Sequence, residues 1–192
     1  MIHKQLPDMV LLLLASCTVS SLDSNLILFQ SRMDGESLQL LKALPISSSQ
    51  QCLAHRKNFL LPWQPVSRHQ YQKGHALAVL HEILQQTFNL FQTHVSLGIW
   101  EESRVERVLA ALHQQLTSVE SLAGLKAEQK RGGSSVQSLR LRIKAYFRRI
   151  HDYLESQRYS SCAWIIVQVE LNRCMVFVFR LTGWLSKQEL DP

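Results

Sequence analysis

Apolar residues return every three or four positions in five stretches of this chain, which is the repeat of an amphipathic helix. Almost no segment alternates as a half-buried strand does. We therefore expect an all-α fold, with helices over about residues 26–44, 68–94, 101–124, 136–157 and 162–186. The residues expected to face the core are Leu26, Phe29, Met33, Leu40 and Leu44 in the first helix, Leu77, Leu80, Leu84, Phe88 and Phe91 in the second, Val105, Val108, Leu112, Leu116 and Val119 in the third, and Leu139, Ile143, Tyr146, Ile150 and Tyr153 in the fourth.

The first connection between these helices is unusually long. It runs from Pro45 to about Ser67 and contains Cys52, a cluster of serines and two further prolines. Connections longer than about 12 to 15 residues are uncommon in compact domains unless they carry a function or are tied down. A long connection also lets successive helices run parallel, so we expect an up-up-down-down four-helix core with one extra helix.

The first 21 residues have the layout of a secretory signal peptide. Lys4 supplies a positive charge, an apolar run follows from Met9 to Ala15, and small residues end at Ser21. The run is shorter than the roughly 20 residues that a membrane-spanning helix needs. We expect cleavage after Ser21, secretion, and one domain over residues 22–192.

Secretion places the remaining cysteines in an oxidising compartment. Cys17 lies in the expected signal peptide, which leaves Cys52, Cys162 and Cys174. Cys162 and Cys174 are about 18 Å apart along one expected helix, too far to bridge each other. Cys174 falls on the core stripe of that helix, whereas Cys162 stands at its exposed start. We expect a disulfide between Cys52 and Cys162 and a buried Cys174.

The chain is basic, with a formal net charge of +6 at pH 7. Such a surface favours acidic receptor patches or sulfated glycans, and nucleic acid is not an expected partner of a secreted chain. Solubility alone explains the charge equally well. The fourth helix carries a basic ladder of Arg140, Lys144 and Arg148 on one face, with His151 beside it. A solvated face is the simpler interpretation of the ladder, and a receptor or glycan contact is the alternative.

The last expected helix is apolar on two sides. Its core stripe is Trp164, Val167, Leu171, Cys174, Val178, Leu181 and Leu185. The opposite side mixes apolar with polar and basic residues, namely Ile166, Val169, Val176, Phe177, Gln168, Asn172, Arg173 and Arg180. Apolar groups mixed with arginine are typical of the centre of a protein interface. A helix buried on all sides is a competing interpretation, and a membrane span over residues 163–185 is disfavoured by its charges.

No catalytic or metal-binding pattern is complete. His81 and Glu82 begin the H-E-x-x-H zinc pattern, but Gln85 stands where the second histidine is needed. The sequence has no G-x-S-x-G elbow and no phosphate-binding glycine loop. We therefore expect neither an enzyme nor a metal or cofactor site.

Four stretches resemble the type I interferon family: CLAHRKNFLLP (Cys52–Pro62), HEILQQTFNLF (His81–Phe91), YFRRIHDYL (Tyr146–Leu154) and YSSCAW (Tyr159–Trp164). The resemblance extends over essentially the whole chain after the signal peptide. It implies a monomeric, secreted helical cytokine. Such a cytokine binds one high-affinity and one low-affinity receptor chain, and so triggers kinase signalling and antiviral and antibacterial innate immune gene expression.

The resemblance also implies site residues. Those for the high-affinity receptor chain are Leu53, Arg56, Gln168, Val169, Asn172, Arg173 and Phe177. Those for the low-affinity chain are Phe88, Asn89, Arg104, Leu109, His113 and Lys144. The apolar pattern of the last helix selects the first surface independently, and Lys144 is also a member of the basic ladder. The alternative function is a secreted basic protein that acts directly on microbes or glycans through that ladder, with salt-sensitive binding.

Overall fold

Helices make up most of the part of the chain that the computed structural model describes, which is residues 25–44, 49–62, 73–94, 99–127 and 134–190. A first helix covers residues 25–42, and the short 3-10 helix η1 covers Ser49–His55. Four long helices follow: α2 (Lys73–His94), α3 (Glu102–Ala127), α4 (Ser134–Ser156) and α5 (Ser161–Leu190). Those ranges contain no strand, so the expected all-α fold is confirmed. The expected signal peptide, residues 1–21, lies outside the described residues.

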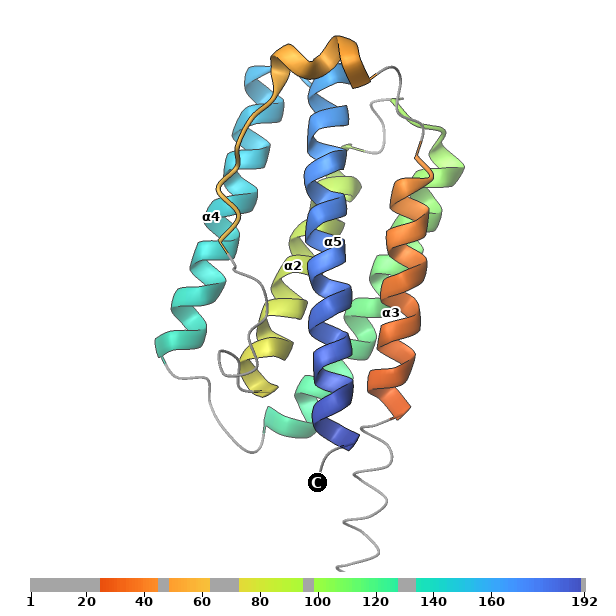
Figure 1. Cartoon of the computed structure of the whole chain (residues 1–192), viewed down its shortest axis with the longest axis vertical. Coiled ribbons are helices and arrows are strands. Elements are labelled where there is room, and N and C mark those ends of the chain that lie inside the picture. Colours follow the sequence, from red (N-terminus) through yellow and green to blue (C-terminus); the bar gives the residue numbers. More distant parts are fainter. Residues whose placement is uncertain (1–24, 45–48, 63–72, 95–98, 128–133, 191–192) are drawn as a thin grey trace, which may run out of the picture.

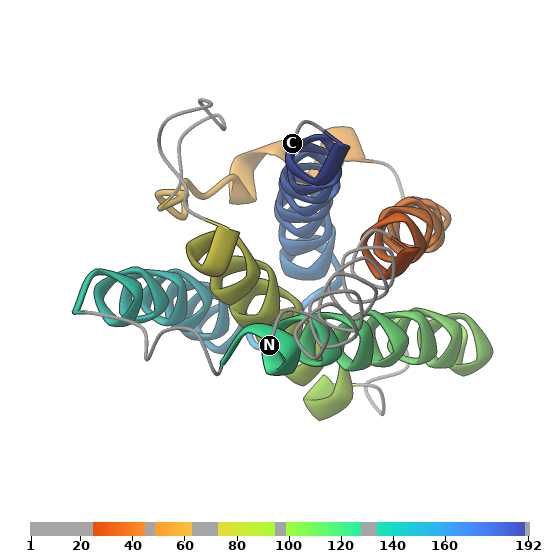
Figure 2. The same ribbon diagram turned by 90° about the horizontal axis from the view of Figure 1, so that it is seen from below.

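The long helices have the expected up-up-down-down order with one addition. In Figure 1 the first helix and α2 run upward, α3 and α5 run downward, and α4 is the extra helix. Figure 2 shows α2, α3 and α4 in one layer, with α5 and the first helix over it. The two successive parallel helices, the first and α2, are the pair that the long connection joins.

The reversal between α4 and α5 is fixed by backbone bonds. Arg158 and Tyr159 have φ angles of 51° and 55°, in the left-handed region where helices commonly end. The backbone N–H of Tyr159 donates to the Leu154 carbonyl at 2.8 Å. The Ser160 hydroxyl accepts from the backbone N–H of Ala163 at 3.3 Å and caps the start of α5. The first turn of α5 is therefore held beside the last turn of α4.

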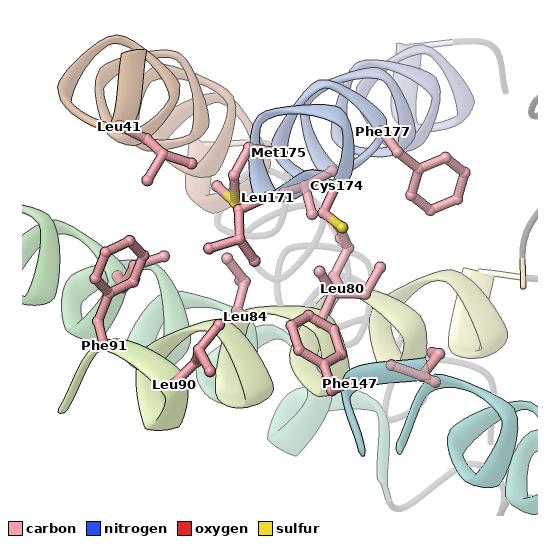
Figure 3. Close-up of a cluster of buried hydrophobic side chains, with 14 of the residues drawn as sticks. Leu41, Leu80, Leu84, Leu90, Phe91, Phe147, Leu171, Cys174, Met175 and Phe177 are labelled. Carbon is pink, nitrogen blue, oxygen red and sulfur yellow. The ribbon is translucent and has the colours of Figure 1, made fainter. Parts of the chain in front are cut away.

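The core is built around α5. All seven residues of its expected stripe are buried, and Figure 3 shows Leu171 and Cys174 pointing toward Leu80 and Leu84 of α2. By length and composition alone α5 is apolar enough to cross a membrane, but 61% of its most apolar window is buried inside the bundle. Burial on several sides explains the apolar character of this helix.

The expected core stripe of the first helix is partly wrong. Met33 and Leu44 are buried, but Phe29 is 48% exposed, and Leu26 and Leu40 are only partly buried. The buried face of the helix carries a mixture of apolar and polar residues instead: Ile27, Gln30, Met33, Asp34, Ser37, Leu41 and Leu44. Polar side chains can occupy a core when they hydrogen-bond to one another, and an apolar repeat does not detect them.

Asp34 is the centre of a buried polar cluster that joins the first helix to α3. Its Oδ1 atom accepts from Nε2 of Gln30 at 2.9 Å and also from Nε2 of Gln115. The Ser37 hydroxyl donates to Oε1 of the same glutamine at 2.9 Å. Burial raises the pKa of Asp34 from 3.8 to about 6, because desolvation of the carboxylate outweighs its hydrogen bonds from Thr182, Gln30 and Gln115.

This shift predicts a pH dependence of stability. Between pH 3.8 and about 6 the unfolded chain loses the Asp34 proton while the folded protein keeps it, so stability falls as the pH rises. The whole shift corresponds to roughly 3 kcal/mol, at about 1.4 kcal/mol per pKa unit. We expect the stability of Asp34→Asn, measured relative to the wild type by urea denaturation, to rise by that amount between pH 3.5 and 7. Parallel pH curves for the two proteins would contradict the assignment.

The long connection is tied at its middle by the expected disulfide. Cys52 in η1 is bonded to Cys162 in the first turn of α5, with the two Cα atoms 5.1 Å apart. The η1 helix consequently packs on α5 at one end of the bundle (Figure 1). The tie gives this long connection a defined position against the last helix.

After η1, residues 56–62 form a clamped segment that runs along α4 (Figure 1). Three side chains of α4 donate to backbone carbonyls at the start and along the length of this segment. The Tyr153 hydroxyl bonds the His55 carbonyl at 2.8 Å, and Arg149 bonds the carbonyls of Phe59 at 2.9 Å and Leu60 at 3.1 Å. Arg142 bonds the Pro62 carbonyl at 2.8 Å. The donors extend from Arg142 to Tyr153, so about three turns of α4 hold the segment.

Candidate interaction surface

The outer face of α5 is narrower than expected. Val169 is 47% exposed, Arg173 is exposed, and Asn172 is partly exposed. Phe177 is only 7% exposed and Gln168 is fully buried, so the expectation that these two face solvent is wrong. Both lie at the edges of the face, where neighbours cover them: Phe177 belongs to the core cluster, and Gln168 lies under the end of the first helix. The exposed part of the face is therefore a strip centred on Val169 and Arg173.

Gln168 has a structural role. Its side-chain amide donates to the carbonyls of Leu41 at 3.1 Å and Leu44 at 3.0 Å. Helices end with carbonyls that lack their regular partner within the helix. The amide bonds one such carbonyl, that of Leu44, and adds a second bond to the Leu41 carbonyl, which also accepts from the backbone N–H of Leu44 at 3.4 Å. The amide thereby joins the first helix to α5.

We expect Gln168→Leu to lower the free energy of unfolding by about 2 kcal/mol, because it removes the side-chain donor of the Leu44 carbonyl and one of the two donors of the Leu41 carbonyl. Denaturant titration followed by circular dichroism measures this change. The matched control is Gln114→Leu on the exposed side of α3, which should change stability by less than about 0.5 kcal/mol. Equal stability of the two variants would show that the Gln168 bonds contribute nothing.

Arg173 is positioned by a buried carboxylate. Nη1 of Arg173 donates to Oε2 of Glu170 at 3.2 Å, and the other carboxylate oxygen accepts from the Tyr146 hydroxyl at 2.7 Å. Glu170 is buried, whereas the Arg173 side chain is largely exposed. The guanidinium group is thus directed before any partner arrives, which lowers the entropy lost on binding.

The free cysteine lies beneath this pair. Cys174 is buried, and its Sγ atom is 3.3 Å from the Tyr146 hydroxyl. Burial raises the pKa of the thiol to about 12, so the group stays protonated. A buried neutral thiol cannot form an intermolecular disulfide while the protein is folded.

Two residues of the long connection lie near the N-terminal end of α5, where Cys162 is bonded to Cys52. Leu53 belongs to η1 and Arg56 follows it directly, and both are exposed. The Cys52–Cys162 bond and the packing of η1 on α5 hold them there. We use the name α5–η1 face for five residues that are exposed or partly exposed on α5 and on or directly after η1: Leu53, Arg56, Val169, Asn172 and Arg173. The face mixes apolar groups with arginine on a fixed backbone, as interface centres do.

Four residues of the second expected set lie together on an α2–α3 face. The rings of Phe88 on α2 and His113 on α3 are 6.2 Å apart between centroids. Asn89 is exposed beside Phe88, and Leu109 lies one turn before His113. Phe88 packs against the core, as its place on the expected stripe predicts, but it is only partly buried and also reaches the surface.

The other two members of that set lie apart from this face. Arg104 is about half a turn from His113 around α3, and it donates to the Ala43 carbonyl at the end of the first helix at 3.3 Å. Lys144 comes from α4, where its Nζ atom is 4.0 Å from the buried Glu82 carboxylate of α2. Arg104 therefore lies outside the α2–α3 face. Lys144 lies near α2 but belongs to α4.

The basic ladder is less charged than its sequence indicates. Lys144 and Arg148 are exposed, but Arg140 is only partly so. Desolvation by burial lowers the pKa of His151, against a smaller opposing effect of Asp152, so this imidazole is neutral at pH 7. Two exposed cations and one partly covered cation remain.

The clamped segment was not predicted from the sequence. Arg142, Arg149 and Tyr153 are spaced by seven and four residues, which places them on one helix face. That spacing was visible in the sequence, but it does not show that the partners are backbone carbonyls some 90 residues earlier. Leu60 was missed as well, because nothing in its type indicates its backbone conformation, which has a φ of 56°.

Among the described residues no three His, Cys, Asp or Glu side chains are grouped to hold a metal ion. The fold is a five-helix bundle with a disulfide-tied connection, and its candidate binding residues lie on two surface faces. An up-up-down-down bundle with a long crossover connection is the architecture of the helical cytokines.

Comparison with known proteins gives the family. Residues 27–185 match the family model of the interferon alpha/beta domain. The chain is 71% identical to interferon epsilon of Mus musculus over 192 residues, covering 100% of both chains, and 58% identical to interferon epsilon of Homo sapiens over 98% of this chain and 91% of that one. It is 39% identical to interferon tau of Cervus elaphus over 81% of this chain and 80% of that one. The protein belongs to the type I interferon family, and it resembles interferon epsilon more than interferon tau.

Proposed function

We propose that this type I interferon is a secreted ligand that assembles two cell-surface receptor chains and thereby starts kinase signalling and antiviral and antibacterial gene expression. The high-affinity chain binds the α5–η1 face, and the low-affinity chain binds the α2–α3 face. Secretion follows from the expected signal peptide over residues 1–21. The ligand is a monomer in this proposal, and its buried free thiol rules out a dimer linked through Cys174.

The observation that carries the proposal is the joint exposure of Val169 and Arg173 on one side of α5, whose opposite side is buried in the core. An apolar side chain and a directed guanidinium group on α5 form a small anchor, and Leu53 and Arg56 lie at the same end of the bundle. A rigid backbone under the anchor lowers the cost of ordering on binding. Gln168 and Phe177 are not direct contacts in this proposal, because both are buried.

The second face supports assembly of two chains. Phe88, Asn89, Leu109 and His113 belong to the layer of α2, α3 and α4, whereas α5 lies over that layer (Figure 2). Two receptor chains can therefore bind without competing for one surface. Lys144 is a peripheral contact of the second chain, and Arg104 has a structural role at the end of the first helix.

Applying the purified protein to matched cells with and without the high-affinity receptor chain tests the function. We expect phosphorylation of signalling transcription factors only in cells that have this chain. The same response in cells that lack it would refute the proposal.

A direct action on glycans is the second candidate, favoured by the exposed Lys144 and Arg148. It requires heparin binding that weakens steeply with salt. The proposal of receptor assembly instead predicts that Arg148→Ala leaves signalling unchanged.

A further inference from the structure

Leu60 is exposed in a backbone conformation that leucine rarely adopts. Its side chain is 63% exposed and its φ is 56°, in the left-handed region. Exposed leucines are common and need no explanation by themselves. A residue with a Cβ atom pays a steric penalty in this region, however, so neighbouring contacts must enforce the conformation.

Those contacts are present on both sides of the residue. The backbone N–H of Leu60 donates to Oδ1 of Asn58 at 3.0 Å, and its carbonyl accepts from Nη2 of Arg149 at 3.1 Å. Next to it, Phe59 is buried with its ring 5.3 Å from that of Tyr153 in an edge-to-face arrangement. The backbone is thus fixed while the leucine side chain points to solvent.

The fixed leucine is connected to the α5–η1 face. The Arg149 guanidinium that holds Leu60 lies 6.0 Å from the centre of the Tyr146 ring. The hydroxyl of that tyrosine bonds Glu170, which in turn holds Arg173. A series of contacts therefore runs from the backbone of Leu60 through the side chains of α4 to Glu170 and Arg173 on α5.

We propose that Leu60 is an additional apolar contact for the high-affinity receptor chain and extends its binding surface from η1 along the clamped segment. The inference rests on the proposed function of the α5–η1 face. A protein interface of standard size covers about 800 Å² on each partner, roughly 30 Å across, so one receptor chain can span both elements. Leu53 on η1 and Leu60 on the clamped segment are then two apolar contacts on either side of Arg56 in the sequence.

Two substitutions of Leu60 distinguish a direct contact with the receptor chain from a role in the stability of the fold. Leu60→Gly removes the side chain and suits a positive φ, and Leu60→Asn places a polar group there while tolerating the left-handed region. Both should fold and unfold at the wild-type temperature or above. We expect each to weaken binding to the soluble high-affinity receptor chain by about tenfold, the loss of one well-placed apolar contact.

The matched control is Leu141→Ala, which truncates another leucine, 57% exposed, on α4. We expect unchanged affinity for this control, measured by surface plasmon resonance beside Val169→Asp. Wild-type affinity of both Leu60 variants with loss of binding in Val169→Asp would overturn the role of Leu60 and leave the proposed function intact. Wild-type affinity of all three would overturn both. A loss with Leu60→Gly but not Leu60→Asn would show that only rigidity matters and would also overturn the contact.

Discussion

Replacing both bridging cysteines by serine, Cys52→Ser with Cys162→Ser, is expected to lower the free energy of unfolding by about 4 kcal/mol. The bond closes a loop with a sequence separation of 110 residues, and constraining a loop of that size in the unfolded chain is worth about 4 to 5 kcal/mol in the chain-entropy model. Urea denaturation followed by circular dichroism measures the loss. We also expect weaker binding at the α5–η1 face, since η1 loses its covalent tie to α5.

Reduction supplies the matched control. The wild-type protein in dithiothreitol should unfold at the urea concentration of the double variant, and the double variant should be insensitive to the reductant. Cys174 is common to both proteins and remains buried. An oxidised wild type that unfolds together with the double variant would mean that the bond does not stabilise the fold.

The parts of the fold that could be predicted from the sequence are those in which apolar repeat and burial coincide. Every residue of the expected stripes in α3 and α5 is buried, because each stripe faces a continuous apolar neighbour. The disulfide could also be predicted. Cys162 and Cys174 lie about 18 Å apart along the same helix and cannot bridge each other, and only Cys162 stands at the exposed start of that helix, where Cys52 can reach it.

The first helix shows where this reasoning fails. Its buried face includes Gln30, Asp34 and Ser37, and the partner of this polar group is Gln115 on α3. The sequence pattern of one helix does not show that a helix distant in the sequence will supply hydrogen-bond partners for its polar side chains. Phe29 was consequently placed inside, although it is exposed.

The candidate site could be predicted only in outline. The mixture of apolar and basic residues on α5 indicated a binding face, but helical spacing gives the angle of a residue and not what covers it. At 100° per residue Gln168 lies about 40° from Asn172 and Phe177 lies about 40° from Arg173 around the helix, yet the first helix covers Gln168 and the core takes up Phe177. The edges of such a face depend on neighbours that the pattern of one helix does not contain.

The central claim is that the exposed strip of α5 is the surface to which the high-affinity receptor chain binds. Val169→Asp tests it, because Val169 is exposed and the variant should fold normally. Bound receptor would bury the new carboxylate in a contact that is apolar in the wild type, and Arg173, one helical turn away, would pair with the carboxylate and be withdrawn from the receptor. Burying the added charge and losing the arginine contact together cost several kcal/mol, and a loss of about 4 kcal/mol is roughly a thousandfold in affinity.

The most direct measurement is the dissociation constant of the purified receptor ectodomain for Val169→Asp, beside the wild type and Leu141→Asp. Leu141 is an exposed leucine outside the α5–η1 face, so its aspartate variant controls for the added charge. We expect the wild type and Leu141→Asp to bind alike and Val169→Asp to lose about a thousandfold in affinity. Wild-type affinity of Val169→Asp would contradict the claim that this strip of α5 is the receptor-binding surface.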